Sequence, residues 1–169
     1  SDGVIESQVR ERGFISVSDP ACGAGALLIA FANVCREKKL NFQQHCLFIA
    51  QDIDVLAGMM CYIQLSLMGC PGHVIVDNTL AKPAMFYDER ALLPAGGTNV
   101  WTTPMMYSDT WQIRQIVARM DLLVRHTGNA PEKVVEKLKA TTKEPEKIPI
   151  PVMKMQELKA DETGQLSLF

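Results

Sequence analysis

Residues 14–29 read FISVSDPACGAGALLI, and this stretch decides the fold. The first five residues, FISVS, favour a pleated strand, because the apolar residues among these five are aromatic or β-branched. Gly23 and Gly25 follow in a turn, and over residues 26–37 the apolar side chains recur at the spacing of one helix face. A strand, a glycine-containing turn and a helix in this order are typical of the first unit of a parallel α/β sheet.

The alternation of strand and helix continues on both sides of this stretch. Residues 4–12 predict a short helix before it, and residues 46–50 form an apolar run typical of a strand covered on both faces. A second helix is predicted over residues 55–68 and a third strand over residues 73–76. We therefore expect an α/β, Rossmann-like fold with a partial parallel sheet in the order β-α-β-α-β and a helical, irregular C-terminal part.

The pattern is weaker after the third strand. Residues 81–97 predict a loop with one short helical turn, residues 99–106 a poor fourth strand, and residues 109–124 a helix. Pro131 opens a short charged helix, and the prolines that follow it indicate a linker. These features divide the chain into a main domain at residues 1–127, a charged helix and linker at residues 128–164, and a tail at residues 165–169.

Composition excludes several classes of protein. Of the 169 residues, 47% are hydrophobic and 21% are charged, so the chain can form a core and is not a disordered protein. The formal net charge of −2 excludes a strongly basic nucleic-acid-binding protein, although a local basic face remains open. No apolar run is long enough for a membrane span, and the N-terminus lacks the pattern of a signal peptide.

The cysteines indicate a reducing compartment. Their number is odd and none forms a Cys-x-x-Cys pair, so we expect reduced, mostly buried thiols in a cytoplasmic protein. No metal site is expected, because the histidines are not at ligand spacing from the cysteines. The residues concerned are Cys22, Cys35, Cys46, Cys61, Cys70, His45, His73 and His126.

Glycines or polar residues lie where each predicted strand ends, at the edge where doubly wound sheets bind ligands. Gly23 and Gly25 let backbone N–H groups approach a ligand after the first strand. The carboxylate of Asp52, at the end of the second strand, can accept hydrogen bonds from both hydroxyls of a ribose. Asp77 and Asn78 follow the third strand and can bond the amino edge of an adenine, although both also suit a simple turn. The pattern indicates an adenosine-containing cofactor.

This cofactor fits S-adenosylmethionine better than a dinucleotide. Leu28 replaces the third glycine of a dinucleotide-binding turn, and Asp19 would repel a pyrophosphate. The Asp19 carboxylate suits the ammonium group of a methionine moiety instead. Asp54, two residues beyond Asp52, is interpreted as the N-cap of the following helix and not as a ligand contact.

Three segments of this half resemble the motifs of adenine-N6 DNA methyltransferases. Residues 19–29, DPACGAGALLI, resemble the first motif, in the form found in the modification subunits of type I restriction systems. Residues 51–54, QDID, resemble the second motif, and residues 78–80, NTL, before Pro83 resemble the third. The resemblance spans residues 14–83 and depends most on the Asp-Pro-x-Cys-Gly-x-Gly string.

The resemblance implies a class I S-adenosylmethionine-dependent methyltransferase fold. It also implies methylation of the N6 amino group of adenine in DNA, in a restriction-modification or mobile-element system. DNA would be the substrate, and the target adenine would be flipped out of the duplex beside the cofactor methyl group. By position, the first motif would hold the methionine moiety, the second the ribose and the third the adenine. The residues carried over are Asp19, Pro20, Ala21, Gly23 and Gly25, then Asp52 with Ile53, and then Asn78 with Asp77.

The chain departs from the family at the catalytic motif, Asn/Asp-Pro-Pro-Tyr/Phe, which does not occur. The nearest segment is residues 102–107, TTPMMY, in which Thr103 and Pro104 are degenerate candidates for the catalytic positions. Thr is a poorer acceptor for the target amino group than Asn or Asp. The chain is also too short for the remaining strands and a target-recognition domain, so we expect a truncated or degenerate methyltransferase domain.

Two other functions stay open. One is a non-catalytic protein that docks on DNA, on a sliding clamp or on a fuller methylase or specificity subunit. The other is a nucleotide-dependent enzyme of another class, which Asp19 disfavours. An exposed edge of the half-sheet would favour a homodimer. The last five residues, QLSLF, resemble the bacterial sliding-clamp-binding peptide, and the contacts would come from Gln165, Leu166, Leu168 and Phe169.

Overall fold

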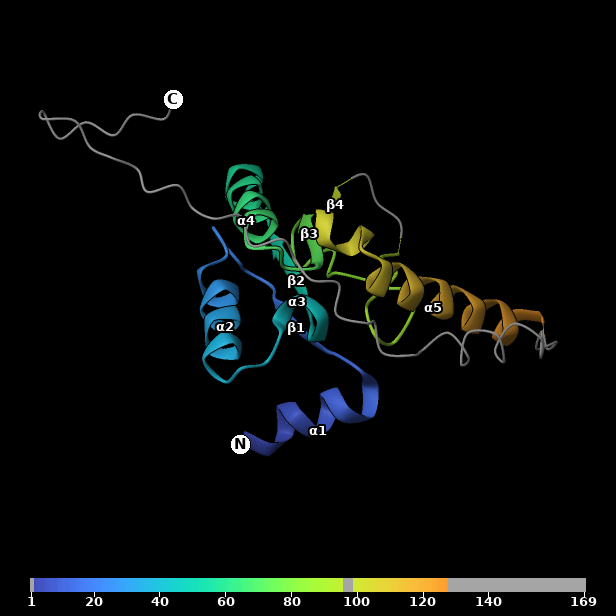
Figure 1. Cartoon of the computed structure of the whole chain (residues 1–169). Helices are drawn as coiled ribbons and strands as arrows, with labels where there is room; N and C mark the ends of the chain where they lie inside the picture. The colour runs from blue at the N-terminus through green and yellow to red at the C-terminus, as the bar shows by residue number, and fades with distance from the viewer. Residues whose placement is uncertain (1, 96–98, 128–169) are drawn as a thin grey trace, which may run out of the picture. The chain divides into compact units, whose positions relative to one another are not determined.

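The computed structural model describes residues 2–95 and 99–127, which fall within one compact unit, residues 1–130. The predicted charged helix, linker and clamp-binding-like tail lie outside the described residues. Figure 1 shows the elements along the chain, which are α1 (Asp2–Arg12), β1 (Ile15–Asp19), α2 (Ala26–Glu37), α3 (Phe42–His45), β2 (Cys46–Asp52), α4 (Val55–Leu67), β3 (Gly72–Val76), β4 (Val100–Thr102), the 3-10 helix η1 (Pro104–Tyr107) and α5 (Asp109–Thr127).

The sheet has the order β1-β2-β3-β4. β1 pairs with β2 and β2 with β3 in parallel, which confirms the predicted strand-helix-strand-helix-strand arrangement. Within the described ranges β1 pairs with no strand other than β2, so its outer edge is open. The fourth strand is shorter than predicted, because Pro104 cannot donate to a ladder and a 3-10 helix begins there. It runs antiparallel to β3.

The predicted helices are present with small differences in their ends. α2 has the predicted bounds, α4 ends one residue earlier, and α5 extends to Thr127. α3 was not predicted, because a four-residue helix carries no periodic signal. It begins where the Asn41 side chain accepts a hydrogen bond from the backbone N–H of Gln43, at 3.1 Å.

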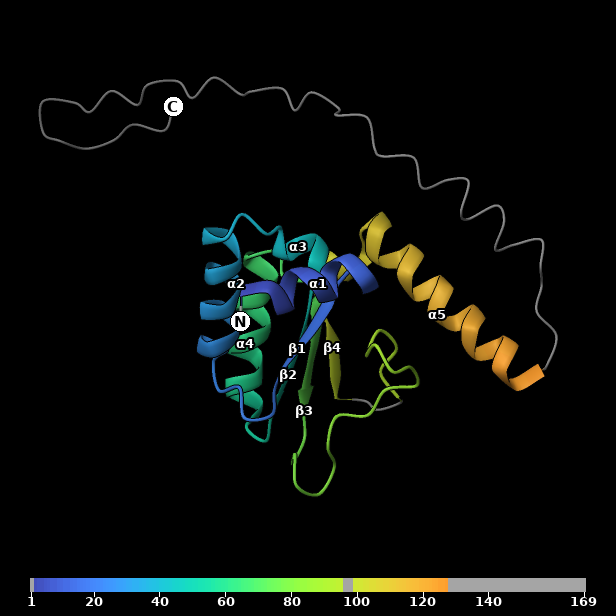
Figure 2. The ribbon, with the colours of Figure 1, turned by 90° about the horizontal axis from the view of Figure 1, so that it is seen from below.

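Helices α2 and α4 cover one face of the sheet, as Figure 2 shows. Because β2 and β3 are buried on both faces, apolar side chains point alternately into two cores. The core under α2 and α4 is formed mainly by Leu28, Ala32, Cys35, Phe48, Ala50, Cys61, Leu65 and Val74.

The other face is covered by the segment that follows β3 and by α5, which lie on the opposite side of the sheet in Figure 2. Residues 81–95 form a loop, as predicted, without a helix; a single turn is closed in it by the hydrogen bond from Ala91 N–H to Asp88 O at 3.2 Å. A helix does not form because the Asp88 carboxylate accepts from the backbone N–H groups of Leu92 and Leu93, at 3.1 and 2.7 Å, and so replaces helical carbonyls. The core on this face is formed mainly by Phe14, Leu47, Ile49, Ile75, Leu92, Met106 and Trp111.

None of the helices in the described ranges combines the length and the apolarity that a membrane span requires.

Candidate functional site

The carboxyl ends of the three parallel strands meet at one edge of the sheet, at the lower end of the view in Figure 2. Asp19 is the last residue of β1 and Asp52 the last residue of β2, and Asp77 directly follows β3. The register pairs Asp19 with Ala50 and Asp52 with Val76, so the three strands end at neighbouring positions. The edge therefore brings together the residues predicted to bind a cofactor, including Pro20, Ala21, Ile53 and Asn78.

The turn after β1 needs glycine at two positions. Gly23 and Gly25 have φ values of +52° and +88°, in the left-handed region. A Cβ atom on Gly25 would lie 2.8 Å from the Cys61 sulfur, whereas a Cβ on Gly23 would meet nothing within 4 Å. The Asp19 carboxylate accepts from the backbone N–H of Ala21 at 3.1 Å and starts the turn. Open space therefore lies over the Gly23 backbone, where a ligand can approach.

Asp52 connects the turns after β1 and β2. Its Oδ2 accepts from the backbone N–H of Gly23 at 2.7 Å, and its Oδ1 accepts from the backbone N–H of Asp54 at 2.9 Å. These hydrogen bonds, first that from Asp54 and then that from Gly23, lower the pKa of the Asp52 carboxyl. The carboxylate is therefore ionised at neutral pH and remains partly exposed. Asp54 caps α4 by accepting from Leu56 N–H at 2.8 Å, as predicted.

The loop after β3 reaches back to the first turn. The Thr79 hydroxyl donates to the carbonyl oxygen of Pro20 at 2.6 Å. Asn78 Oδ1 accepts from the N–H of Leu80 at 2.9 Å, and Asp77 Oδ1 accepts from the N–H of Asn78 at 2.8 Å. Asp77 and Asn78 thus act as turn formers, which was the simpler of their two interpretations, and they lie beside the other two strand ends.

Gln51 was not predicted as a site residue, yet its side chain holds this loop. The side chain is 2% exposed, and its Nε2 donates to the carbonyls of Asp77 and Lys82 at 3.2 and 2.8 Å. Its Oε1 accepts from Ala84 N–H at 2.9 Å. The available signal was a polar residue inside the otherwise apolar run of β2, since a buried amide there needs partners from a neighbouring segment.

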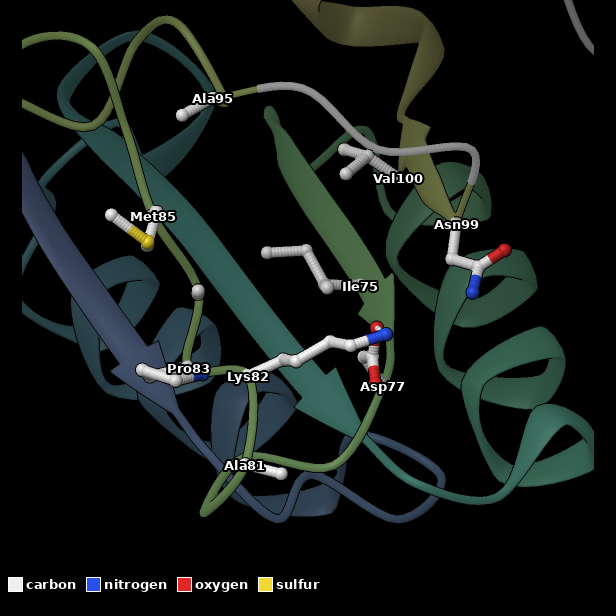
Figure 3. A pocket seen from close by; sticks show the side chains of 10 residues that line it. Ile75, Asp77, Ala81, Lys82, Pro83, Met85, Ala95, Asn99 and Val100 are labelled. Atoms are coloured by element: carbon white, nitrogen blue, oxygen red, sulfur yellow. Dashed lines mark ion pairs between the residues drawn. The ribbon is translucent and has the colours of Figure 1, made fainter.

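A cavity of about 420 Å³ opens beside the end of β3, and Figure 3 shows its lining. Lys82 reaches across to Asp77, with 3.5 Å between Nζ and Oδ2. Of the predicted cofactor residues only Asp77 lines this cavity, so it adjoins the strand-end site without coinciding with it. Its other lining residues are Ile75, Ala81, Lys82, Pro83, Ala84, Met85, Ala95, Asn99 and Val100.

Thr103 and Pro104 are not brought to this edge. β4 is antiparallel to β3, so its end lies at the amino end of β3. Thr103 is fully buried, and its hydroxyl donates to Cys70 O at 2.7 Å and accepts from Gly72 N–H at 2.9 Å. Both hydrogen bonds join β4 to the start of β3, at the opposite edge of the sheet from Asp52.

The cysteines Cys22, Cys35, Cys46, Cys61 and Cys70 are all buried, which confirms their predicted burial. Within residues 2–95 and 99–127, no three His, Cys, Asp or Glu side chains are grouped so that they could hold a metal ion.

Comparison with known proteins gives one match. The model of the N-6 DNA methylase family matches residues 4–133, which is more than half of the chain and includes β1, β2, β3 and the turns that follow them. No curated protein and no solved structure matches the chain. The chain therefore belongs to the N-6 DNA methylase family of adenine-specific DNA methyltransferases.

Proposed function

We propose that this protein binds S-adenosylmethionine at the carboxyl edge of β1, β2 and β3 and takes part in methylation of adenine N6 in DNA, in a restriction-modification or mobile-element system. The observation that carries the proposal is the Asp52 carboxylate, which accepts from Gly23 N–H at 2.7 Å and so joins the first two motif turns. The Thr79 to Pro20 hydrogen bond joins the third turn to the first. One ligand lying across this edge could then contact all three turns.

The residues at this edge fit the chemical groups of the cofactor. The open space over Gly23 admits a ligand close to the backbone of the first turn. Asp19 offers a carboxylate to the ammonium group of the methionine moiety, and Pro20, Ala21 and Gly25 shape the turn around it. The ionised Asp52 has lone pairs left for ribose hydroxyls, with Ile53 beside it. When bound, this cofactor supplies an electrophilic methyl group on its sulfonium.

The described residues contribute binding and orientation to the reaction. Asp19 and Asp52 would fix the two ends of the methionine-ribose portion, and Asp77 with Asn78 would face the adenine. Gln51 keeps the Asp77 loop in place through its three hydrogen bonds. The Thr103 hydroxyl would not accept a hydrogen bond from the target amine at this edge, because it is used in two hydrogen bonds at the other edge.

The test is calorimetric titration of the full chain with S-adenosylmethionine. Asp52→Asn should weaken binding by about tenfold or more, since it removes the charge from a hydrogen-bonded carboxylate. Asp54→Asn is the matched control, because Asn caps a helix as well as Asp does, and it should bind like the wild type. Circular dichroism verifies that both variants fold. No binding by the wild type, or equal affinity in Asp52→Asn, would contradict the proposal.

The second candidate is a non-catalytic protein that docks on DNA, on a fuller methylase or specificity subunit, or on a sliding clamp. The burial of Thr103 at the far edge favours it. Transfer of a labelled methyl group to DNA by the purified chain alone would exclude it. For the clamp, deletion of residues 165–169 should abolish binding to a bacterial sliding clamp, and unchanged binding would refute that contact.

A further inference from the structure

The outer face of α4 carries an apolar stripe that nothing in the described part of the chain covers. Leu56, Met60, Ile63 and Leu67 are 65%, 48%, 52% and 84% exposed. Their spacing of four, three and four residues puts them in one line along the helix, as in the seam of a coiled coil. The opposite face of α4, with Gly58, Cys61 and Leu65, is buried on the sheet.

The stripe is uncharged along its whole length. The thirteen residues of α4, VLAGMMCYIQLSL, contain no Asp, Glu, Lys or Arg. A solvated helix face ordinarily carries charged residues, and an exposed apolar surface of this kind marks an interaction site. α5 also exposes apolar residues, Ile113 and Ile116 among them, but the exposed Arg119 lies on the same helix three residues after Ile116. The α4 stripe is therefore the stronger candidate for a contact with another chain.

The apolar surface continues from α4 onto the edge strand. Met59, Tyr62, Trp101 and Thr102 line a cavity of about 350 Å³ beside the stripe. The rings of Tyr62 and Trp101 lie 6.0 Å apart at 73°, so an edge-to-face pair joins α4 to β4. A partner on the stripe would therefore find additional aromatic surface alongside it.

We infer that a second copy of this chain docks on the α4 stripe, helix against helix, about a two-fold axis. An uncharged face meets no repulsion from its own copy, whereas an acidic or basic partner would gain no attraction from it. The stripe is also symmetric in sequence. In an antiparallel pair, Leu56 of one copy faces Leu67 of the other, and Met60 faces Ile63, so every apolar position has an apolar partner.

The test measures the mass of the full chain by light scattering across a concentration series. The wild type is expected to be a dimer, and Ile63→Glu is expected to weaken dimerisation at least about tenfold, because two buried carboxylates would face apolar side chains. Ile113→Glu, on α5, is the matched control, since the two isoleucines are 52% and 48% exposed, and it should remain dimeric. A wild type that is monomeric at its highest soluble concentration would overturn the inference. So would a dimer that only Ile113→Glu disrupts, or one that neither variant disrupts, which would point to the open edge of β1.

Two further variants keep the inference testable if Ile63→Glu fails to fold. Leu67→Gln changes the most exposed residue of the stripe, at the end of α4, and should also weaken the dimer while circular dichroism stays unchanged. A mixture of Leu56→Cys and Leu67→Cys chains should form disulfide-linked heterodimers under oxidation by air. Homodimers of Leu56→Cys in place of heterodimers would exclude the antiparallel pairing.

Discussion

At the scale of single residues, His73 is a basic side chain held neutral inside the protein. It is 2% exposed, its Nδ1 lies 3.1 Å from Thr102 Oγ1, and its ring lies 6.0 Å from that of Phe86. Burial lowers the pKa of His73 from 6.5 to about 4, against smaller opposing effects of the Leu92 backbone and then of the Asp88 charge. The folded protein therefore takes up a proton at His73 only in acid.

This pKa predicts an acid-sensitive stability. Between about pH 6.5 and pH 4 the unfolded chain binds a proton at residue 73 that the folded chain does not, so the free energy of unfolding falls as the pH falls. We expect His73 to account for a loss of about 2 kcal/mol between pH 7 and pH 5. Urea unfolding at both values measures the loss, and in His73→Gln this part should disappear. An unchanged pH dependence in the variant would contradict the prediction.

At the scale of elements, helices and strands were predictable where the pattern of apolar residues within the element itself indicates its type. The apolar run of β2 and the periodic apolar faces of α2 and α4 fix their bounds within one or two residues. The direction of β4 could not be predicted, because three residues of strand carry no directional signal and the pairing with β3 depends on tertiary contacts. The same reversal takes Thr103 away from the strand-end site.

Another tertiary contact that periodicity does not reveal joins α5 to the amino edge of the sheet. Arg114 donates from Nη1 to Gln44 O at 2.6 Å and from Nη2 to Gly13 O at 3.2 Å. Its guanidinium lies over the rings of Phe14 and Trp111, 5.1 and 4.5 Å from their centroids. One planar cation thus bonds two carbonyls and stacks on two aromatic rings, which a Lys side chain cannot do.

Arg114→Lys should therefore destabilise the protein by about 2 kcal/mol, from the lost charge-assisted hydrogen bonds and stacking. The measurement is urea unfolding at pH 7. Arg119→Lys, at an exposed position of the same helix, is the control and should change the free energy of unfolding by less than about 0.5 kcal/mol. Equal effects of the two substitutions would show that the attachment of α5 to the amino edge of the sheet does not depend on the Arg114 guanidinium.

At the scale of the whole molecule, the two edges of the sheet have separate roles. The carboxyl edge gathers Asp19, Asp52 and Asp77, and the amino edge receives α5 through Arg114. The motifs at the strand ends made the grouping of residues at the carboxyl edge predictable, since parallel strands must bring their carboxyl ends together. The polar Gln51 at the end of an apolar run was a signal in the sequence, but its partners were not predictable, because they come from a segment about thirty residues later whose path only the fold determines.

The distance between the carboxyl and amino edges predicts how the stabilisation by a bound ligand combines with the destabilisation by a mutation at Arg114. Gly13 and Asp19 are six residues apart along an extended strand, roughly 20 Å, so effects at the two edges should add. At a hundred times its dissociation constant, S-adenosylmethionine should stabilise the folded chain by about 2.7 kcal/mol and raise Tm by roughly 8 °C.

Thermal unfolding with and without S-adenosylmethionine measures this shift in the wild type, in Arg114→Lys and in Asp52→Asn. Arg114→Lys should start from a lower Tm and show the full shift, because its site is intact. Asp52→Asn, whose affinity should be lower by about tenfold or more, should show no more than about half of the shift at the same ligand concentration. Were Arg114→Lys to lose the shift as well, the two edges would be coupled through the sheet, and the strand-end site could not be treated as independent of the packing of α5.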